Sequence, residues 1–398
     1  MDKQLINEIL TAAKDGHDDQ VAWRRHLHQN PEIAFQEHDT TRYLRQTCRE
    51  LGLSERKLNM KTGLVAEIKG KRKTPIIAIR TDIDALPVTE QTELEFASRR
   101  PGFMHACGHD MHMASILGTA RILNRFADRL PGTIRFLFQP AEEHPPGGAR
   151  PMIAAGALES VSAILGLHVD PHVPIGKIGL RDGVTMASVT DFDLIVHGRG
   201  GHAARPQDSV DAIVVASELV AALQTVVSRH SDPINSVAIT FGRIEGGTAR
   251  NVIADHVRLT GTARTLSAAD SKRLPKLIKR VADGICRAHG AKAEMNLIAS
   301  YPVLSNSAEV NAAFRRSFES LYGKGKIVLT DQVLGGEDFA CYQEIIPGAM
   351  FRIGIRNPKI GADKPWHSPY FIADERAMES AAAVLATTAI DLLTSEAA

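Results

Sequence analysis

The stretches PIIAIR (residues 75–80), GTIRFLF (132–138) and SAILGLHV (162–169) are short and almost continuously apolar, and they decide the fold class. A segment with helical spacing of its apolar residues, HMASILGTARILNRFA (112–127), separates the first two runs. Short apolar runs separated by helices are typical of a parallel sheet that is buried on both faces. The sequence therefore predicts an α/β fold with a mixed, largely parallel sheet and helices on both faces.

A different rhythm begins near residue 187 and predicts an inserted domain. Its expected elements, in chain order, are a strand at 188–198, a helix at 208–230, strands at 236–244 and 256–265, a helix at 267–290 and a strand at 291–300. This β-α-β-β-α-β order is that of the ferredoxin-like α+β unit. We expect residues 1–186 and 302–398 to form one catalytic domain, with residues 187–301 inserted between its two parts.

Composition argues against several classes of partner. The chain has 47 basic and 46 acidic residues and a formal net charge of +1, so nothing predicts binding to nucleic acid or to an anionic membrane. The four cysteines are far apart in sequence, which does not fit a disulfide scaffold. The N-terminal residues lack the features of a secretory signal, and the apolar stretches are too short or interrupted for a membrane span. We expect a soluble, cytoplasmic protein.

Polar side chains occur where the apolar runs end. Asp82 comes shortly after the first run, Glu142 and Glu143 follow the second, and His168 closes the third. In an open α/β sheet, ligands bind beyond the carboxyl ends of the strands. We therefore expect these side chains to face one crevice.

The motif MHACGHDMHM (104–113) concentrates metal-binding residue types. Cys107 and His109 are two residues apart on a glycine-containing backbone, and thiolate and imidazole are donors that zinc and its neighbours prefer. The alternative is that Cys107 is a buried free cysteine that acts as a small hydrophobe. We interpret His105 and His112 as loop and helix-packing residues.

The adjacent carboxylates Glu142 and Glu143 can divide two tasks, because one can bind a metal while the other takes a proton from a metal-bound water. A solvated acidic pair is the alternative. Taken singly, His168 fits a hydrogen-bonded core histidine and His367 an ordinary loop histidine.

Two further candidates lie in the inserted domain. His202 follows a glycine turn in GRGGHAARP (198–206), and Asn251 follows the glycines of GGTAR (246–250). An exposed turn histidine and a residue that closes a hairpin are the alternatives.

Taken in order, ten motifs resemble those of the amidohydrolase branch of the aminoacylase and carboxypeptidase metallopeptidases. This branch contains hippurate hydrolases, N-acyl-amino-acid amidohydrolases and auxin-conjugate hydrolases. The motifs are WRRHLHQNPEIAFQE (23–37), RTDIDALP (80–87), MHACGHD (104–110), QPAEE (139–143), GLHV (166–169), GRGGHAARP (198–206), GGTARNVIAD (246–255), GTART (261–265), GGEDFA (335–340) and WHSP (366–369). An ordered set of this size is far more specific than any single motif.

The resemblance implies a centre of two divalent metal ions per subunit, with zinc, manganese, cobalt and nickel all open as its metal. Glu142 would be the general base. The implied ligands are Cys107 as the bridge, His109, Glu143, His168 and His367. Asp82 and Asp110 are then expected to orient ligands from behind.

One position departs from more distant relatives, which carry His-x-Asp after the first strand. This chain has Arg80-Thr81-Asp82 there, so a ligand is lost and the Cys107–His109 segment is expected to replace it.

The resemblance also implies that the ferredoxin-like unit is a lid and dimerisation surface, in a homodimer or a dimer-based oligomer. His202 would reach the active site of the neighbouring subunit and stabilise an oxyanion, and Asn251 would contact the substrate. The expected reaction is hydrolysis of a small N-acyl amino acid, hippurate-like or N-acetyl, to a carboxylic acid and a free amino acid through a metal-bound water activated by Glu142.

Two other functions compete with this one. A cysteine hydrolase would use Cys107 as nucleophile with His109 or His202 as base, but it would leave the acidic pair and His168 without a role. A non-catalytic binding protein would keep the fold without the chemistry. It is disfavoured because every proposed ligand and the proposed base are present.

Overall fold

The computed structural model describes residues 2–397, which form two compact units. The first unit contains Met1–Gly183, Ser305–Asp331 and Cys341–Ala398, and the second contains Val184–Leu304 and Gln332–Ala340. The second unit therefore interrupts the first in sequence. It also includes Gln332–Ala340, a segment that the sequence analysis assigns to the other domain.

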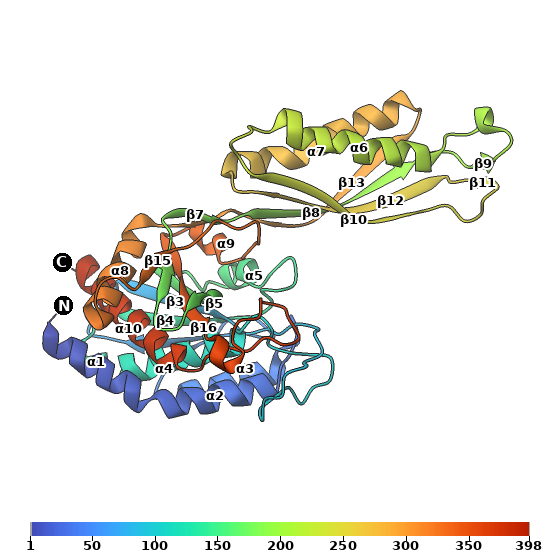
Figure 1. Ribbon diagram of the computed structural model, residues 1–398. Coiled ribbons are helices and arrows are strands. Elements are labelled where there is room, and N and C mark those ends of the chain that lie inside the picture. Colours follow the sequence, from blue (N-terminus) through green and yellow to red (C-terminus); the bar gives the residue numbers. More distant parts are fainter. Residues whose placement is uncertain (1, 398) are drawn as a thin grey trace. The chain divides into compact units, whose positions relative to one another are not determined.

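An eight-stranded sheet forms the centre of the first unit (Figure 1). In spatial order its strands are β1 (Ser54–Arg56), β2 (Leu64–Lys69), β4 (Thr133–Gln139), β3 (Ile76–Asp82), β5 (Val161–Pro174), β16 (Gly348–Arg356), β6 (Ile178–Leu180) and β15 (Ile327–Leu329). The central strands β4, β3, β5 and β16 are parallel to their neighbours in this series, whereas β1 with β2, β2 with β4 and β16 with β6 pair antiparallel. The predicted mixed, largely parallel α/β sheet is confirmed.

Helices cover this sheet and complete its hydrophobic core. They are α1 (Lys3–Asp15), α2 (His17–Gln29), α3 (His38–Glu50), α4 (His109–Asn124), α5 (Ala149–Ala154), α8 (Ala308–Tyr322), α9 (Ala340–Gln343) and α10 (Ala377–Ala397), with short 3-10 turns η1 (Ala127–Arg129) and η3 (Pro358–Ile360). Helices α4 and α10 pack against each other and against β3, in a buried cluster that includes Ile77, Leu117 and Leu385. This packing fixes the start of α4 close to the ends of the central strands.

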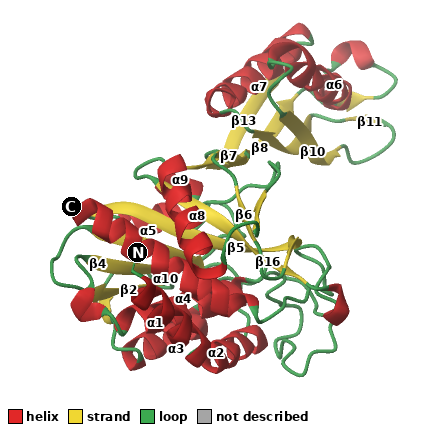
Figure 2. Ribbon diagram, turned by 60° about the vertical axis from the view of Figure 1, so that its left-hand side comes forward, coloured by secondary structure: helices red, strands yellow, loops and turns green. Residues whose placement is uncertain are grey.

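The second unit contains a four-stranded antiparallel sheet with α6 (Ala212–His230) and α7 (Ala268–Ala288) on one face (Figure 2). Its strand order is β10 (Val237–Gly246), β12 (His256–Thr265), β8 (Ser188–His197) and β13 (Lys292–Tyr301). Its smaller elements are β9 (Gly201–His202) with β11 (Val252–Ile253), and the turn η2 (Pro206–Asp208). This is the predicted ferredoxin-like arrangement. The paired strands β7 (Gly183–Met186) and β14 (Leu304–Asn306) span the two sequence boundaries at 183–184 and 304–305.

Two helices, α6 and α10, are long and apolar enough to cross a membrane if only length and composition are considered. In α10, 78% of the apolar window is buried inside the first unit, as is normal for the core helix of a soluble protein. In α6 the buried share is 33%, and its buried residues form the core of the second unit. These helices are therefore weak evidence for a membrane protein.

Candidate metal centre

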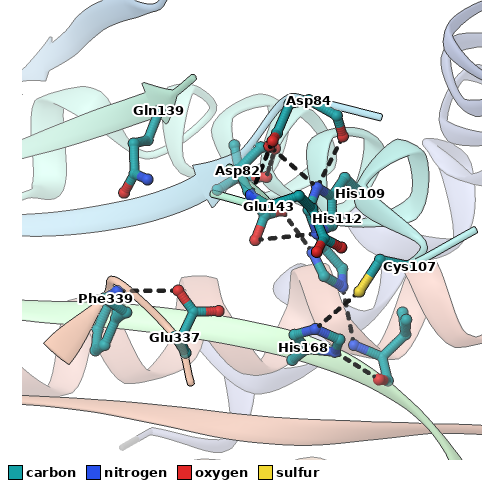
Figure 3. Close-up of polar contacts among 12 residues, drawn as sticks. Asp82, Asp84, Cys107, His109, His112, Gln139, Glu143, His168, Glu337 and Phe339 are labelled. Carbon is teal, nitrogen blue, oxygen red and sulfur yellow. Dashed lines mark hydrogen bonds and ion pairs between the residues drawn. The ribbon is translucent and has the colours of Figure 1, made fainter. Parts of the chain in front are cut away.

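Side chains from several elements of the first unit meet beside the central strands (Figure 3). Asp82 ends β3, and Glu142 and Glu143 follow β4. His168 lies inside β5 rather than at the end of its strand as the sequence analysis expects, because β5 stays paired with β16 beyond this residue. Its ring still faces the thiol of Cys107, which precedes α4.

Helix α4 begins at His109, three residues before the helical segment 112–127 that the sequence analysis predicts. The reason is Gly108, which adopts a φ of 85° at the helix N-cap. A Cβ at this position would lie 2.5 Å from Cγ2 of Val169, so only glycine fits this left-handed turn. Cys107 and His109 are thus held on either side of a sharp turn, with His109 on rigid helical backbone.

Two groups of potential ligands share one residue. Ligand atoms of Cys107, His109 and His168 lie within 4.8 Å of one another, and so do those of Cys107, Glu143 and His367. The Cys107 Sγ is 3.5 Å from the Nε2 of His168, and the Nε2 of His367 is 3.1 Å from an Oε1 of Glu143. The structure therefore brings together all five residues that the sequence analysis names as ligands, with Cys107 in the shared position.

Hydrogen bonds fix two of the imidazoles with Nε2 facing the centre. Nδ1 of His109 contacts the carbonyl oxygen of Asp84 at 2.8 Å, and Nδ1 of His168 contacts that of Val169 at 2.7 Å. A carbonyl can only accept, so each Nδ1 carries a proton and each Nε2 is the nitrogen that a metal can bind. Within residues 2–397, the buried Nε2 of His109 has no hydrogen-bond partner. Buried imidazole nitrogens beside a thiol and a carboxylate fit divalent metal ions.

The peptide of Val169 holds three rings of the centre. Its carbonyl also accepts from Nε1 of Trp366 at 3.0 Å, and its N–H donates to Nε2 of His112 at 3.0 Å. Nδ1 of His112 is 2.7 Å from Asp82. Although Asp82, His109 and His112 also have ligand atoms within 4.8 Å of one another, both nitrogens of His112 are already engaged. His112 is therefore better described as a support for His168 than as a ligand.

The chain matches the model of peptidase family M20/M25/M40 over residues 78–391. A similar relative is the N-acetylcysteine deacetylase of Bacillus subtilis, 42% identical over 388 residues that cover 96% of this chain and 99% of the relative. The chain belongs to this M20 family. Another relative, the N-acyl-L-amino acid amidohydrolase of Geobacillus stearothermophilus, is 40% identical and covers 76% of this chain and 80% of its own length.

Solved structures agree with this assignment. A dinuclear metal-binding M20 peptidase of Bacillus subtilis has 40% sequence identity, a TM-score of 0.83 and coverage of 96% of this chain and 99% of its own. A putative aminohydrolase of methicillin-resistant Staphylococcus aureus has 34% identity, a TM-score of 0.93 and coverage of 97% and 99%. This M20 chain is a metal-dependent amidohydrolase with two divalent metal ions as cofactors.

Charges divide the candidate ligands of this M20 centre into two classes. Burial raises the pKa of the Cys107 thiol, and the nearby carboxylates raise it further. Burial opposes the charged form of His109, but the carboxylates led by Asp82 outweigh it and raise the pKa of His109 to about 10. Burial, followed by the charge of Arg352, lowers the pKa of His168. Without metal, Cys107 and His109 therefore hold protons at neutral pH, while His168 is neutral.

Metal binding should consequently release protons and strengthen as pH rises. A thiol and an imidazolium must each lose a proton to become ligands, so we expect a release approaching two protons per subunit at pH 7. Titration calorimetry of metal-free protein in buffers with different ionisation enthalpies measures this number directly. A binding enthalpy that does not depend on the buffer would contradict the assignment of Cys107 and His109.

A buried ion pair occupies residues 80–82, where more distant relatives carry His-x-Asp. Arg80 is buried and donates to Asp82 at 2.8 Å and to Gln139 at 2.9 Å. Asp82 in turn contacts His112, and its Oδ2 is 3.7 Å from the Nε2 of His109. Asp82 thus holds His112 and lies near the Nε2 of His109, the side that faces the centre, and its role in orienting ligands stays a prediction.

Asp110 has a different role from the one expected. It contacts the Nε of Arg24 at 3.0 Å and Nδ1 of His28 at 2.9 Å, which fastens α2 to the start of α4. Burial disfavours the charged form of His28, but Asp110 and Glu90 outweigh this and raise the pKa of His28 to about 9. Asp110 therefore supports the helix that carries His109, and its hydrogen bonds within residues 2–397 go to Arg24 and His28 rather than to a proposed ligand.

His202 and Asn251 lie together in the second unit: His202 is on β9, and Asn251 directly precedes the paired strand β11. The N–H of Ala203 donates to the carbonyl of Asn251 at 3.1 Å, and His202 pairs with Val252 in the register. The N–H of Ala204 donates to Nδ1 of His202 at 3.1 Å, which places the ring proton on Nε2. Both side chains are exposed, so that a donor N–H of His202 is available at this surface.

Sequence reasoning missed two supporting residues, Asp84 and Trp366. Asp84 contacts His109 through its carbonyl and accepts the N–H of Glu143 at 2.9 Å through its Oδ2. Its place two residues after Asp82 in RTDIDALP was the available signal. Trp366 directly precedes His367, but nothing in the sequence indicates that its indole reaches Val169.

Proposed function

We propose that the enzyme hydrolyses N-acyl amino acids to a carboxylic acid and a free amino acid. The observation that carries this proposal is the pair of ligand groups that share Cys107, with a ligand atom of Glu142 within 4.8 Å of those of His109 and Glu143. The names of the two relatives, a deacetylase of N-acetylcysteine and an amidohydrolase of N-acyl-L-amino acids, support the same substrate class.

The proposed ligands are Cys107, His109, Glu143, His168 and His367. When bound, the two ions would acidify a water molecule and polarise the amide carbonyl. Glu142 takes the proton from the attacking water and then gives it to the departing amine, because a single carboxylate beside the scissile bond can act as base and then as acid. The acyl group leaves as a carboxylic acid, and the amino acid leaves with its amine restored.

His202 is the proposed donor to the oxyanion of the tetrahedral intermediate, with Asn251 as a second substrate contact. Its Nε2–H, fixed by the hydrogen bond to Nδ1, supplies the required donor. We propose that His202 acts on the active site of the neighbouring subunit of a homodimer. The ferredoxin-like unit would then be both the lid and the dimerisation surface. A cytoplasmic location also remains a prediction.

Loss of this donor should lower turnover more than binding. We expect His202→Ala to reduce kcat by about 10²- to 10³-fold, the usual effect of removing one oxyanion donor. His197→Ala is a matched control, since His197 is exposed in the same unit. Mixing inactive His202→Ala and Glu142→Gln subunits should restore about a quarter of the wild-type sites if the donor acts across a dimer. Mixtures as inactive as their components would refute action across subunits.

A substrate screen tests the function itself. Metal-stripped protein is supplied separately with Zn, Mn, Co or Ni and assayed against N-acetylcysteine, a panel of other N-acetyl amino acids and N-benzoylglycine. We expect release of free amino acid from at least one of them, lost with a chelator and regained with metal. Protein that binds two ions but hydrolyses none of these amides would contradict the proposal. Activity that resists chelation would favour the cysteine hydrolase instead.

A further inference from the structure

The residue before the proposed base has an unfavourable backbone. Ala141 is fully buried and has a φ of 55°, in the left-handed region that side chains other than glycine avoid. Glu142 and Glu143 follow directly, so the direction of both carboxylates depends on this one turn. Something in the surrounding structure must stabilise it.

Glu37 supplies that stabilisation from a distant part of the sequence. Its side chain is fully buried, and its Oε1 accepts the N–H of Ala141 at 2.9 Å and the N–H of Phe35 at 2.9 Å. Phe35 also has a positive φ, of 60°. One carboxylate oxygen therefore holds two left-handed residues, one in its own segment and one beside the proposed base.

Asp84 holds the other end of the same short segment. Its Oδ2 accepts the N–H of Glu143 at 2.9 Å. The N–H groups on either side of Glu142 are thus each bonded to a buried carboxylate, Glu37 before it and Asp84 after it. Asp84 also contacts the proposed ligand His109, whereas in the described part of the chain Glu37 hydrogen-bonds to Ala141, to its own segment and to Thr62, and to no proposed ligand.

We propose that Glu37 is a positioning residue that fixes the Ala141 turn and thereby aims Glu142 at the reacting water. This inference rests on the proposed function, because it takes Glu142 as the base. Glu37 touches neither substrate nor metal in this account, and its effect on catalysis passes through the backbone of Ala141.

The free-energy cost of burying the charged carboxylate of Glu37 supports a specific role for this side chain. Burial, with the charge of Asp84 acting in the same direction, raises the pKa of Glu37 to about 7 despite its hydrogen bonds. A glutamine or an apolar side chain would avoid that cost. Above this pKa the carboxylate is charged, and a charged acceptor makes stronger hydrogen bonds to N–H groups than a neutral one, which suits two strained peptides.

The test compares Glu37→Leu with Glu37→Gln. Leucine removes the acceptor, so we expect kcat to fall about 10- to 100-fold with KM within about twofold, since small misplacements of a catalytic group have effects of this size. Glutamine keeps an acceptor oxygen and should restore most of the activity. Both variants should bind two metal ions, with an unchanged visible spectrum of the Co²⁺ form.

Glu32→Leu is the matched control. Glu32 is a buried glutamate of the same segment that accepts the N–H groups of Asp39 and Thr40, at 3.2 Å and 2.8 Å. Its loss should lower the melting temperature without lowering kcat. An equal fall of kcat in both leucine variants would show a general folding effect and overturn the proposal.

A double variant shows whether Glu37 acts through Glu142. Glu37→Leu combined with Glu142→Gln should be no slower than Glu142→Gln alone. Once residue 142 can no longer take a proton, its exact position no longer affects the rate. Multiplied effects would overturn the proposal.

A crystal structure of Glu37→Leu separates this inference from the proposed function. If Glu142→Gln is fully active, the function assignment fails, and the inference about the turn is then judged by the φ of Ala141 alone. A turn that moves out of the left-handed region supports the role of Glu37. An unchanged turn refutes it.

Discussion

Replacement of Glu142 by glutamine is expected to lower kcat by about 10²- to 10⁴-fold, the range that general base catalysis contributes. Glutamine has nearly the same shape but cannot take a proton from water. Because Glu142 is not a proposed ligand, both metal ions should stay bound and KM should change little. Steady-state kinetics with elemental analysis of the same samples measure both quantities.

A matched control for this variant is Glu344→Gln, which removes an exposed carboxylate paired with Arg150. It should leave turnover unchanged. If Glu142→Gln binds two ions and turns over near the wild-type rate, Glu142 is not the base, and another group must accept the proton.

Cys107→Ala is expected to weaken both metal sites and to abolish most activity. Cys107 is the residue common to the two ligand groups, so its loss removes one donor from each. We expect metal affinity to fall by at least about 100-fold, more than typical losses from the supporting residues around a metal site. His367→Ala should weaken only one ion, since His367 belongs to one group. Equilibrium dialysis with metal analysis distinguishes these two patterns.

Cys48→Ala is the control, because Cys48 is also a buried free thiol in the first unit. It should keep both ions and full activity, with a modest loss of stability from the small cavity. A Cys107→Ala protein that binds both ions normally but is inactive would point to nucleophilic catalysis by the thiol. The pKa of Cys107, raised by burial and nearby carboxylates, argues against that role in the metal-free protein.

The fold was largely predictable because its signals are local. The apolar runs at 75–80 and 132–138 became β3 and β4, since buried parallel strands need apolar residues on both faces. The predicted start of α4, at residue 112, was too late, because the helical periodicity can be read only from the first repeated apolar residue onward. The true boundary depends on Gly108, whose turn is imposed by the close approach of Val169.

The identities of the metal-binding side chains were predictable, but their supports were not. Donor types and motif order pointed to Cys107 and His109, because few residue types bind zinc-like metals. The roles of Val169 and Glu37 depend on where backbone groups point after the strands have paired. That information lies in tertiary contacts such as Glu37 with Ala141, 104 residues apart in sequence.

The most direct test of the central claim is anomalous X-ray diffraction from crystals loaded with Mn²⁺ or Zn²⁺. We predict two peaks about 3.5–4 Å apart, the usual separation in two-metal hydrolases. Both should contact Sγ of Cys107, one together with His109 and His168 and the other together with Glu143 and His367. A single peak, or an ion bound by Asp82 and His112 away from Cys107, would contradict the shared two-metal centre.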